Sequence, residues 1–275
     1  KISHKITLLF TLFIIGAINS QEKLKGNKEV TTEDRTISDF NKIEVIDNVA
    51  VFLTYNEKQS VNVETDSNLQ EAVITEVNNG TLVIKLNDKI VRKKELMVHI
   101  KVNRKLKEIN SYKSAKIMSK NSLAIDSLTI NSFDNSDIDL KLNSKILQIN
   151  SKKSSDLKLE ILSNYININA IENSGIKGTF DTKDALFTLL DRASINIDGS
   201  ATHVEIETLG NTSYKGKDFK SDEALVNATN SSNTYINAKK TIDIRAKNSA
   251  EVYLYSNPKI TITEFFDKAS LQKRD

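Results

Sequence analysis

Three stretches of the sequence repeat one pattern and decide the fold: Leu128–Ile138 reads LTINSFDNSDI, Leu147–Leu157 reads LQINSKKSSDL and Ile166–Ile176 reads ININAIENSGI. Each contains an apolar–polar alternation, a polar turn and the start of a second alternation. Alternation with a period of two is typical of strands with one buried face. A further copy, with one extra residue near its front, begins at Leu106. A unit this short cannot bury its own apolar face, so the copies must stack on each other.

Weaker copies continue the repeat through the second half of the chain, and the pattern recurs on average about every 19 residues. This period predicts an all-β fold, a right-handed parallel β-helix in which each coil contributes two or three short strands. The regular hexapeptides of a left-handed β-helix and the spacing of leucine-rich repeats are both absent from the sequence. An up-and-down β-sandwich is the alternative fold. The weaker copies begin near Leu186, Val204, Leu225, Ile242 and Ile260.

Asparagine and small hydroxyl residues recur at fixed places in the repeat. Asn110, Asn131, Asn150 and Asn169 hold the same place in successive copies, and Asn227 returns to it. Stacked amides can hydrogen-bond to each other, as they do in cross-β stacks, so an asparagine ladder is predicted. A serine or threonine marks the following turn, where a hydroxyl can satisfy turn amides. These hydroxyl residues are Ser114, Ser136, Ser155, Ser174, Ser194, Thr212 and Ser249.

The N-terminal third has strand patterns but no clear repeat. Residues 43–55 and 96–102 alternate apolar and polar side chains. Asn78-Asn79-Gly80 separates two apolar stretches, which is a strong signal for a hairpin turn. We therefore predict that residues 39–105 form antiparallel strands and hairpins, packed on the β-helix or continuous with it. The β-helix repeats are predicted over residues 106–275, with the stretch from Glu264 as a cap for the last coil.

The first twenty residues have the layout of a secretory signal peptide. Basic residues precede the apolar run Ile6–Ile15, and small or polar residues follow it. A membrane-spanning helix needs roughly 20 apolar residues, so this run predicts a signal peptide over residues 1–20 rather than an anchor. We place cleavage after Ser20, with Ala17 as the alternative. No later segment is apolar enough to span a membrane. Residues 21–38 are polar and aperiodic, which predicts a flexible leader.

Composition excludes several functional classes. The 275 residues contain no Cys, which excludes a disulfide scaffold, a thiolate metal site and a cysteine nucleophile. The 8 Gly are too few for collagen or for a Gly-rich calcium-binding β-roll. With 39 basic and 36 acidic residues the formal charge is +3, which argues against nucleic acid as the partner. His99 and His203 are interpreted as lone histidines without clustered carboxylates, so no metal and no cofactor are predicted.

The order of these features resembles a known family. The resemblance begins with Phe40–Val45 (FNKIEV) as the opening strand. It continues through the Asn-Asn-Gly hairpin and the strand Val98–Val102, and it covers the repeats to about Tyr255. This organisation is similar to the family described as "putative auto-transporter adhesin, head GIN domain", found in secreted proteins of Bacteroidetes. The family carries Ser-Gly-Ser-Gly at the repeat turn, where this chain mostly has other residues in place of glycine. The resemblance implies an exported β-helical protein with an adhesin-like role, and it brings no catalytic residue.

Two pairs of side chains are candidates for ligand binding. Asp137 and Asp156 hold equivalent places in successive copies, which would set two carboxylates about one strand spacing apart. Stacked carboxylates serve β-helical enzymes that cleave acidic polysaccharides, with calcium or as an acid–base pair. Tyr214 and Tyr235 hold comparable places one copy apart and would form an exposed track for sugar rings or peptide. The structural alternatives are a solvated turn beside lysines and strand aromatics that pack on their neighbours.

The sequence therefore predicts an exported, non-enzymatic β-helical protein that binds at the cell envelope or surface in an adhesin-like role. The predicted partner is a glycan or an envelope or surface protein, and the predicted location is the periplasm, the cell surface or the extracellular space. Two alternatives stay open. One is a polysaccharide-active lyase or hydrolase that uses Asp137 and Asp156. The other is a self-assembling structural scaffold of the envelope.

Overall fold

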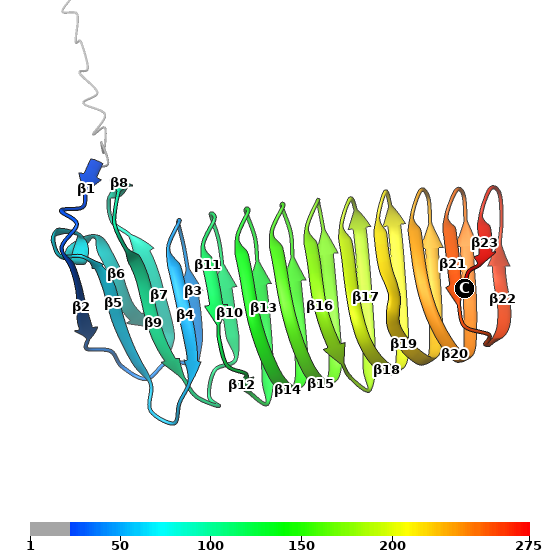
Figure 1. Cartoon of the computed structure of the whole chain (residues 1–275), viewed down its shortest axis with the longest axis horizontal. Coiled ribbons are helices and arrows are strands. Elements are labelled where there is room, and N and C mark those ends of the chain that lie inside the picture. The colour runs from blue at the N-terminus through cyan, green and yellow to red at the C-terminus, as the bar shows by residue number, and fades with distance from the viewer. Residues whose placement is uncertain (1–22) are drawn as a thin grey trace, which may run out of the picture.

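The computed structural model describes residues 23–275 as one elongated stack of coils (Figure 1). About 70% of these residues lie in strands, and the described part contains a single short 3-10 helix, η1. The elements in chain order are β1 (Lys23–Lys25), β2 (Val30–Arg35), β3 (Lys42–Val45), β4 (Ala50–Tyr55), β5 (Ser60–Asp66), η1 (Ser67–Ala72), β6 (Val73–Asn78), β7 (Thr81–Leu86), β8 (Lys89–Arg92), β9 (Leu96–Val102), β10 (Glu108–Ser111), β11 (Lys116–Ser119), β12 (Leu123–Ala124), β13 (Ser127–Ser132), β14 (Asp137–Ser151), β15 (Asp156–Ile171), β16 (Gly175–Asp181), β17 (Asp184–Asp191), β18 (Ser194–Gly210), β19 (Ser213–Thr229), β20 (Asn233–Lys247), β21 (Glu251–Tyr255), β22 (Lys259–Phe265) and β23 (Ser270–Lys273).

The longest strands each bend around a corner and so contribute to both sides of the stack. β14 runs along one side from Asp137, bends at residues 143–145 and runs along the other side to Ser151. A tight turn at residues 152–155 then leads into β15. β14 and β15 pair in parallel with Asp137 opposite Asp156, and the coils of the stack follow each other about 19 residues apart. The parallel β-helix and the period predicted from the repeat are confirmed.

The core lies between the two sides of each coil and is largely apolar. Along β15, Leu157, Leu159, Ile161, Ile166 and Ile168 are at most 3% exposed, and the side chains between them point outward. Burying one such side chain stabilises the fold by about 1.5–3 kcal/mol. Because each coil covers the apolar edge of the next, the core is continuous along the axis.

The predicted asparagine ladder is confirmed. The side-chain amides of Asn131, Asn150 and Asn169 each donate to the amide oxygen of the ladder asparagine one coil before, over 2.8, 2.8 and 3.0 Å. Asn227 occupies the same register position three coils after Asn169. The ladder fixes the register of neighbouring coils, because a shift by one residue would turn every amide to the other face.

The turn serines act differently from the prediction. Ser136, Ser155 and Ser174 are at most 1% exposed. Their hydroxyls donate to the backbone carbonyl of a serine in the preceding coil, over 3.1, 2.8 and 3.2 Å, rather than accepting from turn amides. At three of the predicted places the inward position belongs to an alanine and the serine beside it is exposed. These exposed residues are Ser114, Ser194 and Ser249.

The N-terminal end differs from the prediction in its topology. β3 and β4 pair in parallel, rather than antiparallel, with their neighbours β10 and β11, so this segment continues the β-helix, which is one of the two predicted alternatives, and the stack of coils begins near Lys42. β7 and β9 form a coil on the outer side of β3 and β4, although they follow them in the chain. Antiparallel pairing is found in the cover at this end: β6 on β7, β5 on β9 and β2 on β5. The predicted Asn-Asn-Gly hairpin is confirmed, with positive φ at Asn79 and Gly80.

The structure also describes how the two terminal segments pair. The flexible leader predicted over residues 21–38 is wrong for most of its length, because β1 pairs with β8 and β2 pairs with β5. The segment predicted as a cap from Glu264 onward adds a further half coil: β23 pairs in parallel with β21, and Ala269 and Leu271 pack on the core. β22 is exposed along its whole length. The predicted signal peptide, residues 1–20, lies outside the described residues.

Candidate functional site

The two predicted carboxylates lie together in a hollow that also contains lysines. Asp137 and Asp156 are register partners on β14 and β15, and they line a hollow of about 210 Å³ together with Asp139. The Nζ atom of Lys116 lies 3.2 Å from the Asp137 carboxylate, and that of Lys158 lies 3.1 Å from the Asp139 carboxylate. The described lining of this hollow contains no histidine. It is therefore a surface of balanced charge, typical of stacked coils with alternating acids and bases.

The predicted tyrosine track is wrong at Tyr214. Tyr214 lies opposite Thr234, whereas Tyr235 lies opposite Lys215, so the two tyrosines differ by one place in register. One place along a strand turns a side chain to the other face of the sheet. Tyr214 is therefore in the core, 0% exposed and stacked on Phe187 with ring centroids 5.9 Å apart. Burial raises the pKa of its phenol, and the side chain cannot reach a ligand outside the protein.

Tyr235 belongs to a half-buried stack of rings on the outer surface. Its ring lies on that of Tyr253 in the next coil, with centroids 4.4 Å apart and planes inclined by 10°. The guanidinium of Arg274 lies 5.1 Å above the centre of the Tyr253 ring. The hydrogen bond from Tyr253 to the Glu251 carboxylate, together with burial, raises the pKa of Tyr253 to about 12. These contacts occupy one ring face of Tyr235 and both ring faces of Tyr253, on which a sugar would otherwise stack.

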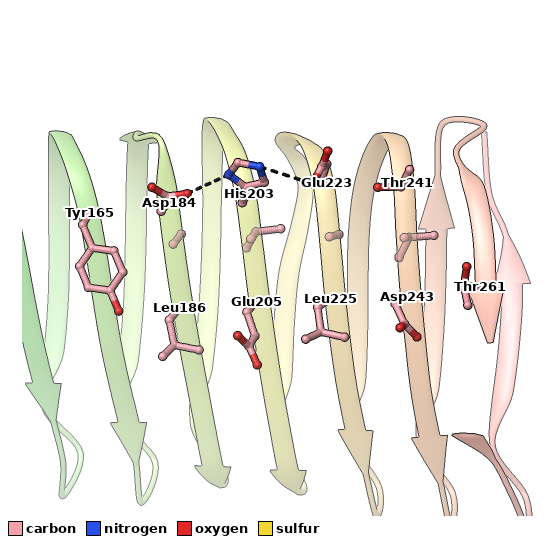
Figure 2. A pocket seen from close by; sticks show the side chains of 14 residues that line it. Tyr165, Asp184, Leu186, His203, Glu205, Glu223, Leu225, Thr241, Asp243 and Thr261 are labelled. Atoms are coloured by element: carbon pink, nitrogen blue, oxygen red, sulfur yellow. Dashed lines mark hydrogen bonds and ion pairs between the residues drawn. The ribbon is translucent and has the colours of Figure 1, made fainter. Parts of the chain in front are cut away.

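A second hollow, which sequence reasoning missed, crosses β15, β17, β18, β19, β20 and β22 on the side of the stack opposite the carboxylate hollow. We call it the groove, and its volume is about 540 Å³. Successive strands place its outward side chains in two rows that run along the axis of the β-helix (Figure 2). The first row contains Tyr165, Asp184, His203, Glu223 and Thr241, and the second contains Leu186, Glu205, Leu225, Asp243 and Thr261.

His203 lies in the first row between carboxylates of the two neighbouring coils. Its Nδ1 atom is 2.8 Å from Oδ1 of Asp184, and its Nε2 atom is 3.4 Å from Oε2 of Glu223 (Figure 2). Both ring nitrogens can donate at once only when the imidazole is protonated. Each of the three side chains is about half exposed, so water weakens these ion pairs. Their main effect is to hold the imidazole ring in line with the row.

The second row alternates apolar and acidic side chains from coil to coil. Leu186, Glu205, Leu225 and Asp243 follow each other in register, and all four are half-buried. Asp243 accepts a hydrogen bond of 2.7 Å from Thr263. Glu205 has no hydrogen bond or ion pair with any residue in the described part of the chain. A carboxylate beside leucines can hold a hydroxyl or an ammonium group whose carbon skeleton lies on the apolar side chains.

The groove carries a negative charge that nothing in its wall offsets apart from His203. Its described lining contains four carboxylates and neither lysine nor arginine. Complementary potential therefore favours a neutral or cationic ligand over an anionic one. Within residues 23–275 no group of three or more His, Asp or Glu side chains is placed to hold a metal ion.

The groove is hard to find by motif because its side chains are far apart in the sequence. Asp184, His203 and Glu223 follow each other at close to one repeat period, so the period applied to the outward positions would have aligned them. The interpretation of His203 as a histidine without carboxylates is wrong, since one flanks each side of the ring. His99 also has an acidic partner, with Nε2 2.8 Å from Oε2 of Glu64.

One family of known sequences matches most of the chain. Residues 39–258 match the model of a family described as "Putative auto-transporter adhesin, head GIN domain". No curated protein matches the sequence. Among the residues described, no helix has the length and apolar character needed to cross a membrane.

Three solved structures share the fold. A "putative lipid binding protein" from Parabacteroides distasonis is 19% identical, with a TM-score of 0.68, and the match covers 92% of this chain and 100% of that one. A "putative adhesin" from Parabacteroides merdae is 18% identical, with a TM-score of 0.67, covering 92% and 99% of the two chains. A second "putative adhesin" from Parabacteroides distasonis is 16% identical, with a TM-score of 0.63, covering 92% and 100%. At these identities the similarity shows the fold alone.

Proposed function

Because the chain belongs to the putative auto-transporter adhesin, head GIN domain family, we propose that it is an exported, non-enzymatic surface protein that holds its ligand in the groove. The family supports an adhesin-like role in general. The groove supplies the specific place, since it joins acidic, apolar and aromatic side chains in one hollow. The proposed ligand is a glycan or an envelope or surface protein.

The single observation that carries this proposal is the pair of rows along the groove. The rows repeat from coil to coil, so they present an elongated surface rather than one convergent centre (Figure 2). A catalytic site needs a nucleophile, base or acid aimed at one reacting atom. An elongated surface with a few polar groups and apolar walls instead suits the binding of a chain-like ligand. The carboxylates Asp137 and Asp156, beside their lysines, offer the enzymatic alternative no comparable support.

The proposal is tested by blocking the groove without changing its charge. In Thr241→Trp an indole would fill the groove from an exposed position of the first row. We expect this variant to lose binding in a screen of immobilised glycans and envelope proteins, with an unchanged melting temperature. Thr229→Trp on β19 is the control, because Thr229 lies outside the groove lining. Equal binding by both variants, or no binding by the parent protein to any member of the screen, would count against the proposal.

A second candidate, the self-assembling scaffold, is favoured by a different observation. The last coil leaves Ile260, Ile262 and Phe265 exposed by 43%, 50% and 37%. An uncovered apolar strand edge is a surface on which other strands can pair. It predicts that the purified chain associates through this end.

A further inference from the structure

The groove differs in charge from the rest of the stacked coils. At several other places a carboxylate of one coil pairs with a lysine of the next, as in Asp134 with Lys153 at 3.2 Å and Lys152 with Glu172 at 3.4 Å. Four successive coils place carboxylates in the groove, and its described wall offers only His203 as a partner. Such lysine partners are missing from the described wall of the groove over four successive coils, which suggests that a ligand supplies the cations.

Exposed apolar side chains lie near one end of the groove: Ile146 and Tyr165 in register on neighbouring strands, and Leu162 at the corner of the coil, three residues before Tyr165. Ile146, Leu162 and Tyr165 are 51%, 57% and 37% exposed. Ile146 and Tyr165 are register partners, and Tyr165 is in turn the partner of Asp184 at the first carboxylate of the groove. Isolated apolar side chains on a surface are ordinary, but a cluster at the end of a hollow marks an interaction site. A ligand that covers this surface must therefore place apolar groups at one end of the groove and cationic or polar groups along its carboxylates.

The distance along the axis sets the size of the ligand. From the coil of Tyr165 to the coil of Asp243 there are four strand spacings, about 19 Å at roughly 4.8 Å each. An extended peptide rises by roughly 3.3 Å per residue, so about six residues cover this length. Such a segment has side chains on both sides of its backbone, and one side can face the groove.

On the basis of the proposed function, we infer that the occupant of the groove is an extended basic segment of a partner protein. It is about six residues long, with an apolar side chain at one end and Lys or Arg along the rest. The apolar end packs on Ile146, Leu162 and Tyr165, and the cations meet the carboxylates of the groove. Charge complementarity favours such a segment over a neutral sugar chain, whose hydroxyls would leave the four carboxylates without a counter-charge.

Glu205 is the central contact of this recognition. A lysine ammonium can reach its carboxylate while the aliphatic part of the side chain lies on Leu186 and Leu225. Glu205 has no partner in the described part of the chain, so binding breaks no existing bond there. Asp184 and Glu223 already contact His203, so they attract a ligand cation less than Glu205 and Asp243 do.

The test uses fluorescence anisotropy with labelled heptapeptides and the chain from residue 21 onward. The probe carries two leucines followed by three lysines spaced by glycines, and matched probes carry glutamine or glutamate in place of lysine. We expect the lysine probe to bind and the glutamine and glutamate probes not to bind. High salt should weaken the binding of the lysine probe. The double variant Glu205→Gln/Asp243→Asn should weaken it by about tenfold or more, the equivalent of one charge-assisted hydrogen bond. The double variant Ile146→Ser/Leu162→Ser should also weaken it.

The control removes the same charge elsewhere. Asp137→Asn/Asp139→Asn neutralises two carboxylates in the other hollow, and we expect a change of less than about twofold. Equal weakening by both double variants would show non-specific attraction and would overturn the inference. A glucosamine hexamer that binds where the lysine probe does not would overturn the choice of a protein partner. A ligand from the screen that binds the parent protein and Glu205→Gln/Asp243→Asn equally but fails to bind Thr241→Trp would overturn the inference while the proposed function stands.

Discussion

The hydroxyl group of Tyr214 is buried in the core of the β-helix, where no residue of the described chain accepts a hydrogen bond from it. Phe187 and Phe219 pack nearby in the same aromatic cluster. A buried donor without a partner costs about 1–3 kcal/mol of unfolding free energy. Because the ring packs on its aromatic neighbours, this loss of unfolding free energy comes from the unpaired hydroxyl group and not from the ring.

Replacing this residue should therefore stabilise the protein. We expect Tyr214→Phe to raise the unfolding free energy by about 1 kcal/mol in urea titrations followed by circular dichroism. Tyr235→Phe is the control, because that ring lies on the surface stack and its loss of a hydroxyl should leave stability unchanged. A less stable Tyr214→Phe variant would show that the hydroxyl is satisfied, for instance by a buried water molecule.

Asp66 is a buried carboxylate that holds the N-terminal cover in place. It is 0% exposed and accepts hydrogen bonds from the backbone amides of Lys28, Lys94 at 2.7 Å and Glu95 at 3.3 Å. Burial by itself would raise the pKa of Asp66, but these hydrogen bonds outweigh it and the net pKa is lowered. The ionised carboxylate thus joins the loop before β2, the end of β5 and the loop before β9.

The sign of the pH dependence follows from the lowered pKa. Asp66 stabilises the folded state fully above its unfolded-state pKa of about 3.9, and this stabilisation is lost as the pH falls through the folded-state pKa. We expect Asp66→Asn to increase hydrogen exchange in β2 and in residues 92–95 at pH 7, measured by mass spectrometry. The difference from the parent protein should shrink below about pH 4. Equal exchange in both proteins at pH 7 would refute the role of Asp66.

At the scale of elements, the asparagine ladder ties β10, β13, β14 and β15 together. Asn150 is in the middle of it, since it donates to Asn131 and accepts from Asn169. Asn150→Ala removes both hydrogen bonds and leaves the amides of its neighbours without these partners. We expect a loss of about 1–3 kcal/mol in unfolding free energy, measured by thermal and urea denaturation.

Asn227 is a matched control for the ladder. It holds the same register position but its neighbours are Glu207 and Arg245 rather than asparagines. Asn227→Ala should therefore cost less than Asn150→Ala. Equal costs would mean that packing of the asparagine side chain, and not the ladder, stabilises this face of the coils.

The elements that repeat could be predicted from the sequence because in-register stacking brings the same place in each copy together. The parallel coils and the ladder from Asn110 to Asn169 follow from this rule alone. The Asn-Asn-Gly hairpin was equally clear, because its turn requires residues that tolerate positive φ. These features depend on local pattern and on one period.

Elements that depart from the period could not be predicted in the same way. Tyr235 comes one place after Thr234, the register partner of Tyr214, and β19 adds extra residues between Gly216 and Lys220. One extra place changes a surface residue into a core residue. The groove could not be predicted for a related reason. Its side chains differ in type from coil to coil, and only the spacing of Asp184, His203 and Glu223 relates them.

At the scale of the whole molecule, the two ends of the stack are unlike (Figure 1). The N-terminal end is covered by β2, β5 and β6. At the other end, Ile260 and Ile262 are 43% and 50% exposed, whereas Ile242 and Ile244 one coil earlier are at most 1% exposed. An exposed apolar edge strand promotes association between molecules.

We expect the purified chain to self-associate through this end as its concentration rises. Ile260→Asn/Ile262→Asn should lower the mean mass measured by light scattering, with little change in melting temperature because both side chains are already exposed. Val91→Asn/Leu209→Asn removes two exposed apolar side chains elsewhere and is the control. An equal decrease in both variants would indicate general stickiness, and a monomer at every concentration would remove the scaffold candidate.

The coil made of β3 and β4 has a consequence for biosynthesis. It is the first coil in the chain, yet it lies between β7 and β9 on one side and β10 and β11 on the other. During N-to-C synthesis both of its edges stay open until β7 has emerged, and the edge facing β11 stays open until residue 119 has emerged, because all of its neighbours come later. All strands of the N-terminal cover and of the first two coils lie within residues 23–102, so a nascent chain can complete this end once β9 has emerged and then add the coils from β10 onward in order. Until then the open strand edges of this stretch can attract chaperones or other chains.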